Sequence, residues 1–230
     1  MRLRVVFSKD GAARYISHLD LCRTLERAFR RAHIPVSYSQ GFNPKPRFSV
    51  ASALMLGARA SAEVMDVHLD GCMRPEDFVA KLRSALVPGI RIEKARVLEP
   101  AARDCAAAVA AAYYVIEFSG HIQDAGALVR AFVEAPSVMV QKQSKGKTRA
   151  VDARSVVLRL EALSKDQVGV LLDLSGPSLR PSEVAAALLR LPQGKDDDAG
   201  AATRVDSVIC RQELFARRNG DLVPLFLASI

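Results

Sequence analysis

The sequence lacks the patterns that identify several common classes of protein. Its cysteines are few and far apart, without a Cys-x-x-Cys pair or a nearby histidine: Cys22, Cys72, Cys105 and Cys210. This excludes the spacings typical of zinc sites, thioredoxin-like sites and iron–sulfur clusters. No Walker loop, GxGxxG, HExxH or GxSxG motif is present. We therefore expect buried, reduced thiols, with no metal and no cofactor held by this chain alone.

Long apolar runs are also missing. The apolar stretch near the N-terminus covers only Val5–Phe7, too short for the core of a signal peptide. The Ala-rich uncharged run Cys105–Ile116 is shorter than the roughly 20 residues that span a bilayer. We expect a cytoplasmic protein without a membrane partner.

Acidic residues are scarce in one part of the chain. Residues 1–60 contain 11 basic and 3 acidic side chains, whereas the rest contains 22 of each, so the net charge of +8 lies in the first quarter. A localised positive charge favours a polyanionic partner such as nucleic acid or a lipid surface. A small acidic substrate remains an alternative.

The 230 residues are half apolar, enough for one ordinary core or two small ones. Periodicity and turn residues predict two similar series of elements. The first has strands at 2–7, 36–39, 48–54, 64–69 and 90–98, with helices from the Ser17 cap to Pro35 and at 75–86. The second has strands at 113–118, 138–143, 151–163, 168–174 and 205–214, with helices at 123–134 and 181–191.

This order is close to β-α-β-β-α-β, which is the ferredoxin-like plan. We therefore predict an α+β protein of two tandem ferredoxin-like (βαββαβ) halves with antiparallel sheets. The expected domains are 1–104, which carries a basic helix, and 105–230. A single larger α+β domain is the alternative.

The first predicted helix carries a row of arginines. Arg23, Arg27 and Arg30 share one helical face, with Arg31 beside them and Arg14 just upstream. Planar guanidinium groups suit phosphate oxygens, so we predict that these residues bind RNA. The alternative is a solvated face whose charges complement the helix dipole.

Two further segments combine cations with features of nucleic-acid sites. A proline-stiffened loop presents Phe42, Asn43, Lys45 and Arg47, near Tyr38. Aromatic rings beside cations are typical of single-stranded RNA sites, although Phe42 and Tyr38 could equally belong to the core. The second segment contains no acid and supplies Lys142, Lys145, Lys147 and Arg149; its alternative is a charged hairpin tip.

His18 is the single candidate for catalysis. It lies at the start of the basic helix, where a general acid or base is conceivable. Its neighbours Ser17 and Asp20 are explained by helix capping, however, and a helix N-terminus disfavours a protonated imidazole.

Several motifs carry a resemblance to a known family. They are Lys9-x-Gly11-x-x-Arg14-Tyr-Ile-Ser-His-Leu-Asp20, then Glu26-Arg27-Ala28-x-Arg30-Arg31-Ala32-x-Ile34-Pro35, Tyr38-Ser39-Gln40-Gly41-Phe42-Asn43-Pro44 and Leu56-Gly57, with Lys142–Arg154 as a second segment. The chain resembles the radical SAM-linked protein family of unknown function. This resemblance implies a bacterial cytoplasmic protein that works with a radical SAM partner, in RNA metabolism. The family's usual histidine between the two loop prolines is Lys45 here.

A more distant likeness is to the RAMP-type CRISPR endoribonucleases, whose C-terminal glycine-rich loop is absent here. We interpret the chain as an RNA-binding accessory subunit of a radical SAM enzyme. The alternatives are a metal-independent endoribonuclease that uses His18, and a protein–protein adaptor.

Overall fold

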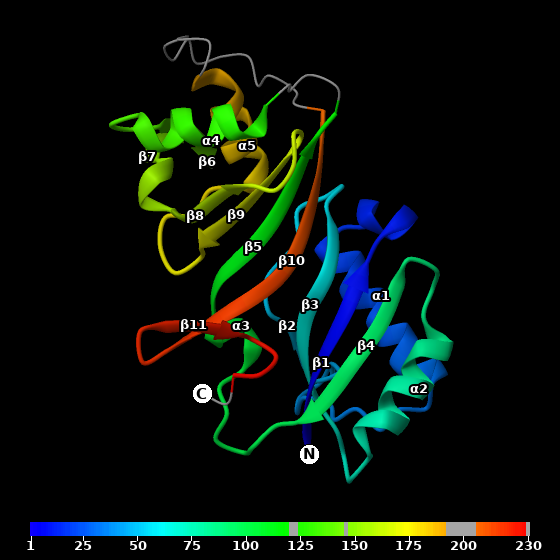
Figure 1. Cartoon of the computed structure of the whole chain (residues 1–230). Helices are drawn as coiled ribbons and strands as arrows, with labels where there is room; N and C mark the ends of the chain where they lie inside the picture. The colour runs from blue at the N-terminus through cyan, green and yellow to red at the C-terminus, as the bar shows by residue number, and fades with distance from the viewer. Residues whose placement is uncertain (120–123, 145–146, 192–205, 229–230) are drawn as a thin grey trace. The chain divides into compact units, whose positions relative to one another are not determined.

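The computed structural model describes residues 1–119, 124–144, 147–191 and 206–228 (Figure 1). Its contacts divide the chain into two compact units, one formed by Met1–Ala110 with Arg211–Ile230 and the other by Ala111–Cys210. The C-terminal residues from Arg211 therefore belong to the first unit, although they follow the second unit in sequence. The expected domains, 1–104 and 105–230, stay a prediction.

The first unit is built on an antiparallel sheet with the order β4-β1-β3, with β2 paired to the end of β3. The strands are β1 (Arg2–Lys9), β2 (Phe48–Val50), β3 (Arg59–His68) and β4 (Ile90–Val97). From the end of the chain, β10 (Ser207–Arg218) neighbours β3 and pairs with β11 (Asp221–Pro224).

The two faces of this sheet differ in chemistry because side chains alternate along a strand. Leu3, Val5 and Phe7 of β1 point to one face and are fully buried in the core. Helices α1 (His18–Arg31) and α2 (Pro75–Ala85) supply the other side of this core. The opposite face receives the alternate residues, beginning with Arg2 and Arg4.

Helix α1 confirms the predicted N-terminal cap. The Ser17 hydroxyl accepts a hydrogen bond from the Asp20 amide at 3.1 Å. The helix ends at Arg31, before the expected stop at Pro35, because His33 adopts a φ of 50° that a right-handed helix cannot contain.

The predicted strand at 36–39 is wrong. This segment makes only two isolated bridges, Val36 with Leu69 and Tyr38 with Pro46. The strand expected at 48–54 is reduced to β2. Prolines at 44 and 46 remove amide donors on the opposing part of the loop, so no continuous ladder forms there.

The second unit contains three strands in the antiparallel order β5-β9-β8. A separate antiparallel hairpin is formed by β6 and β7. The elements are β5 (Val109–Phe118), α4 (Ala125–Glu134), β6 (Met139–Ser144), β7 (Lys147–Asp152), β8 (Val157–Ala162), β9 (Gln167–Asp173) and α5 (Pro181–Arg190). The short α3 (Cys105–Ala108) precedes β5.

The single strand expected at 151–163 is divided into β7 and β8. Between them, the Asp152 carboxylate accepts amide hydrogen bonds from Val138 and Arg154, both at 3.0 Å, and so stabilises a 3-10 turn at Ala153–Ser155. The predicted start of the preceding helix, at residue 123, lies outside the described residues.

The chain is therefore a mixed α+β protein with mostly antiparallel sheet, as predicted at this level. The tandem ferredoxin-like arrangement stays a prediction. No helix in the described part of the chain has the length and apolar character to cross a membrane.

Candidate functional site

The exposed face of α1 carries the predicted arginines, but they differ in their partners. Arg23 pairs with Asp20 at 3.2 Å on the surface. The Ser17 hydroxyl and then Arg23 lower the pKa of the Asp20 carboxyl. The guanidinium groups of Arg27 and Arg30 are exposed and form no hydrogen bond or ion pair with the described residues. These two cations are therefore available to a ligand.

Arg14 and Arg31 bind the protein's own backbone. Arg14 Nε donates to the Gly57 carbonyl at 2.8 Å, and its guanidinium lies 5.0 Å from the centre of the Tyr15 ring. Arg31 donates to the Ala85 carbonyl at the end of α2 at 2.7 Å. Both residues thus have structural partners that the sequence pattern did not indicate.

His18 lies on the first turn of α1 next to Cys22, with 3.8 Å between Nε2 and Sγ. Burial raises the pKa of the Cys22 thiol. His18 Nδ1 is buried and has no hydrogen-bond partner in the described parts of the chain. The nearby Asp20 is engaged in the cap by Ser17 rather than in orienting the imidazole. A catalytic role of His18 stays a prediction.

The loop at 40–47 is closed at its base and exposed at its end. Ser39 and Lys45 exchange two hydrogen bonds, from the Ser39 amide to the Lys45 carbonyl at 2.9 Å and from the Lys45 amide to the Ser39 hydroxyl at 3.0 Å. Phe42 is fully exposed, and Asn43 and Lys45 beside it are exposed as well. The alternative that Phe42 belongs to the core is wrong.

The C-terminal basic segment lies in the β6–β7 hairpin of the second unit. Lys142 pairs with Arg149 across the hairpin, and Ser144 pairs with Lys147. Lys142 Nζ donates to the Ser178 carbonyl at 2.5 Å, whereas Arg149 is exposed. Lys145 lies outside the described residues.

A row of two arginines and one histidine crosses the sheet face opposite α1 and α2, and the sequence analysis identified only Arg47 among them. Arg2 of β1 is paired directly with His68 of β3. The His68 amide donates to the carbonyl of Arg47 at 2.9 Å, which places Arg47 at the same level. Arg47, His68 and Arg2 therefore lie side by side on three neighbouring segments.

This row lines a hollow of about 550 Å³. Its wall consists of polar and apolar side chains from the N-terminus and three strand ends: Met1, Arg2, Ser37, Arg47, His68, Leu69, Val97, Leu98 and Pro100. Burial, followed by the positive charges of Arg47 and Arg2, lowers the pKa of His68. The hollow thus combines two arginines with a histidine whose pKa depends on the charges around it.

The side chains of the next row on the same face are engaged by contacts within the protein. It contains Ser49, Asp66, Arg4 and Arg96 at matching positions of β2, β3, β1 and β4. Arg4 binds both Asp66 oxygens, at 2.8 and 2.9 Å, with both side chains almost fully buried. Its other donors reach the carbonyls of Leu225, Ala228 and Arg103.

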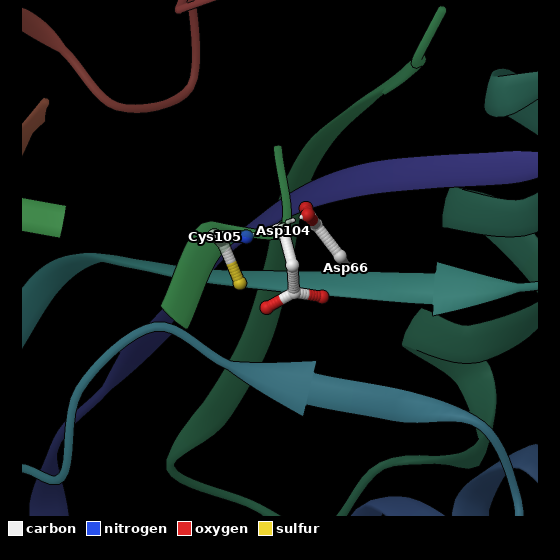
Figure 2. Close-up of side chains that lie close together, drawn as sticks. All are labelled: Asp66, Asp104 and Cys105. Carbon is white, nitrogen blue, oxygen red and sulfur yellow. Dashed lines mark hydrogen bonds between the residues drawn. The ribbon is translucent and has the colours of Figure 1, made fainter. Parts of the chain in front are cut away.

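Asp66 also lies beside Asp104 and Cys105, and one potential ligand atom from each lies within 4.8 Å of the others (Figure 2). The Cys105 amide donates to Asp66 at 2.8 Å, and the Ser49 hydroxyl donates to Asp104 at 2.6 Å. Burial raises the pKa of the Cys105 thiol to about 12. A cation would have to displace Arg4 and deprotonate this thiol, so these contacts fit a structural role better than a metal site.

A second buried ion pair lies near the other end of β3. Arg211 of β10 binds both carboxylate oxygens of Glu63, and a further donor reaches the Ser52 carbonyl at 2.9 Å. Lys9 is buried nearby and donates to the Ile16 carbonyl at 3.1 Å; burial lowers the pKa of its ammonium. Every group in this cluster has a structural partner.

Only part of the row formed by Arg2, His68 and Arg47 could be predicted from the sequence. The alternation Arg2-Leu3-Arg4 at the start of a strand indicates two cations on one face, but nothing local indicates that His68 and Arg47 lie beside them. That pairing spans more than 60 residues of sequence.

Comparison with known proteins identifies the family at the level of sequence. Residues 2–181 match the family described as uncharacterised proteins conserved in bacteria, DUF2344. No curated protein matches the chain. The match covers the elements from β1 to β9 and ends at the first residue of α5. The chain therefore belongs to the DUF2344 family.

Proposed function

We propose that this protein binds RNA in the bacterial cytoplasm through the exposed arginines of α1 and the end of the loop at 40–47. The observation that carries the proposal is the pair Arg27 and Arg30. Both are exposed on one helical face, and neither forms an ion pair with an acid among the described residues; Asp20, whose charge also interacts with that of Arg27, is paired with Arg23. Such guanidinium groups bind phosphate oxygens of any nucleotide sequence.

The fully exposed ring of Phe42 supports RNA as the partner. Stacking of a base on an exposed apolar ring is favourable, because it removes the surface of the ring from water. Asn43 and Lys45 beside it offer hydrogen bonds and charge. In the second unit, Arg149 offers a further exposed cation on the hairpin that Lys142 fastens to the Ser178 carbonyl.

Fluorescence anisotropy with labelled single-stranded and hairpin RNAs, at several salt concentrations, tests this proposal. We expect binding that weakens steeply with salt. The variant Arg27→Gln should weaken binding to all sequences and reduce the salt slope by about one. Arg91→Gln removes an exposed arginine from β4 and is the matched control, with an unchanged slope expected.

The same samples on a denaturing gel separate the other interpretations. Cleaved RNA, with cleavage lost in His18→Ala, would replace the proposal by an endoribonuclease that uses His18. An absence of RNA binding even at low salt would overturn it and favour a protein–protein adaptor.

We also propose that the partner protein is a radical SAM enzyme, to which this chain presents RNA. The resemblance of the Lys9–Asp20 and Tyr38–Pro44 motifs to the radical SAM-linked family supports this. Co-expression with the radical SAM protein encoded beside or fused to such chains is the test. Co-elution in size-exclusion chromatography is expected, and separate elution at micromolar concentration would contradict it.

We propose a ferredoxin-like plan for the first unit. The antiparallel order β4-β1-β3-β2, with α1 and α2 both contributing to one core, supports this plan. A repeat of it in the second unit is supported by the antiparallel order β5-β9-β8 and by α4 and α5.

A further inference from the structure

We propose that the hollow lined by Arg2, Arg47 and His68 binds the phosphate group of a phosphomonoester. This site is distinct from the α1 arginines, because it lies on the opposite face of the sheet. Its volume of about 550 Å³ is in the range of small-ligand sites, large enough for a phosphate together with part of the group that carries it.

Arg2, Arg47 and His68 are held at one level of the sheet. Directly opposed residues on neighbouring antiparallel strands have Cβ atoms about 5 Å apart. Arg2 and His68 are such a pair, and Arg47 is fixed beside His68 by the backbone hydrogen bond of 2.9 Å. Like charges at this spacing repel one another, and a bound dianion removes that repulsion.

Arg2 and Arg47 keep guanidinium donors that the described residues do not use. The Arg2 guanidinium is held at one end, where Nη2 donates to the carbonyls of Glu99 and Ala102. Its Nε is buried and has no hydrogen-bond partner within the described parts of the chain. The Arg47 side chain is exposed and forms no hydrogen bond or ion pair with described residues. Unused guanidinium donors beside a hollow suit the oxygens of a phosphate.

Three acids near the hollow are engaged elsewhere, and Glu99, between the lining residues Leu98 and Pro100, is exposed and does not line it. Asp66 is neutralised by the bidentate Arg4, and Asp104 accepts from the Ser49 hydroxyl and the Ala106 amide. Asp70 accepts from the Ser37 hydroxyl at 2.5 Å. No acidic side chain is among those that line the hollow. Its charge therefore remains positive and open to an anion.

His68 allows the site to be observed directly. The groups that act on its pKa are Arg47 and Arg2, which lower it, and Asp104 and Asp66, which raise it. A bound anion favours the imidazolium and opposes the two arginines, so it raises the pKa of His68. By linkage, affinity for an anion then increases as the pH falls through the interval between the free and bound pKa values.

The experiment follows the histidine side chains by NMR while inorganic phosphate is added to the full chain. The chain has only four histidines, and His68→Gln assigns the relevant signal. We expect a saturable shift of the His68 signal and a rise of its pKa. A rise of about one unit means about tenfold tighter binding to the protonated form. Repeating the pH series with sulfate, which does not titrate in this range, assigns the proton to the protein.

Arg47→Gln is the decisive variant, because the exposed Arg47 side chain can be replaced without disturbing the core. We expect about tenfold or greater loss of phosphate affinity, as for a lost hydrogen bond to a charged group. Arg27→Gln removes the same charge from α1 and should leave phosphate binding unchanged. If both variants lose equally, or if phosphate causes no saturable shift, the proposed site is wrong.

Three further ligands identify the source of the phosphate. They are a nucleoside 5′-monophosphate, and one short RNA with either a 5′-phosphate or a 5′-hydroxyl. A preference for the phosphorylated RNA that disappears in Arg47→Gln indicates an RNA end, and equal binding of the mononucleotide indicates a small metabolite. Because Arg27→Gln reports on the α1 surface and the His68 signal on the hollow, failure of one proposal is distinguishable from failure of the other.

Discussion

Arg4 illustrates what a buried charge requires of the residues around it. Its guanidinium is 1% exposed and uses its donors on Asp66 and on three backbone carbonyls. A charge removed from water is tolerated only when its donors are matched in this way. The same arrangement explains why the acid Asp66 lies buried in β3 between the apolar Met65 and Val67.

Removing the Asp66 charge should therefore be costly. In Asp66→Ala, Arg4 keeps its charge in the interior without a counter-ion, and we expect the free energy of unfolding to fall by about 3–5 kcal/mol. Urea denaturation followed by circular dichroism measures this change. Arg23→Gln, which breaks the exposed pair with Asp20, is the control and should leave the midpoint almost unchanged. Equal effects of the two variants would contradict the structural role of Asp66.

Cys105 differs from the other cysteines in its surroundings. It is fully buried, and burial raises the pKa of its thiol to about 12, whereas Cys72 is exposed. At pH 8 the Cys105 thiol is therefore almost entirely protonated. We expect iodoacetamide to modify Cys72 in the native protein and to modify Cys105 only after denaturation, as measured by peptide mass spectrometry. Comparable native rates for the two residues would show that Cys105 is accessible.

At the scale of elements, the helices were the most predictable part of the chain. Ser17 with Asp20, and proline at the first position of α2 and α5, are local signals that act within one turn. The strands were less so: β3 begins at Arg59 rather than Val64, and the segment at 36–39 pairs through isolated bridges only. A strand's length depends on partners that are distant in sequence, which local patterns do not contain.

The cap of α1 matters because this helix carries Arg27 and Arg30. In Ser17→Ala the Asp20 amide loses its acceptor, and we expect the free energy of unfolding to fall by about 1 kcal/mol. Ser84→Ala is a matched control, because the Ser84 hydroxyl donates to the Lys81 carbonyl within α2 and caps no amide. Thermal unfolding of both variants tests this. A cost for Ser84→Ala as large as that for Ser17→Ala would show that the loss is not specific to the cap.

At the scale of the whole molecule, the two candidate sites differ in how far apart in sequence their residues are. The exposure of the α1 arginines could be predicted from helical spacing alone. The hollow could not, because Arg2, Arg47 and His68 meet only through strand pairing across the first unit. The return of residues 211–230 to that unit was equally hidden, since two of the carbonyl acceptors of Arg4, those of Leu225 and Ala228, are more than 200 residues away in sequence.

This return predicts that the end of the chain stabilises the N-terminal sheet. The segment 225–228 supplies carbonyls to Arg4 and to Arg96, the latter at 2.5 and 2.9 Å, and the Phe226 ring lies under Lys94 at 4.6 Å. In a chain ending at Pro224, Arg4 Nη1 loses both of its carbonyl acceptors and Arg96 loses those of Phe226 and Ala228. A buried donor that loses its acceptor costs about 1–3 kcal/mol.

We therefore expect the truncated chain to unfold at a clearly lower temperature than the full chain, as measured by calorimetry. Amide hydrogen exchange should increase in β1 and β4, which carry Arg4 and Arg96, more than in β8 and β9 of the second unit. Leu227→Ser, which changes an exposed side chain of the same segment, is the control and should keep the original unfolding temperature. Unchanged exchange in β1 and β4 would mean that the sheet holds these arginines without the C-terminal carbonyls, and that the polar face is stable when open to water.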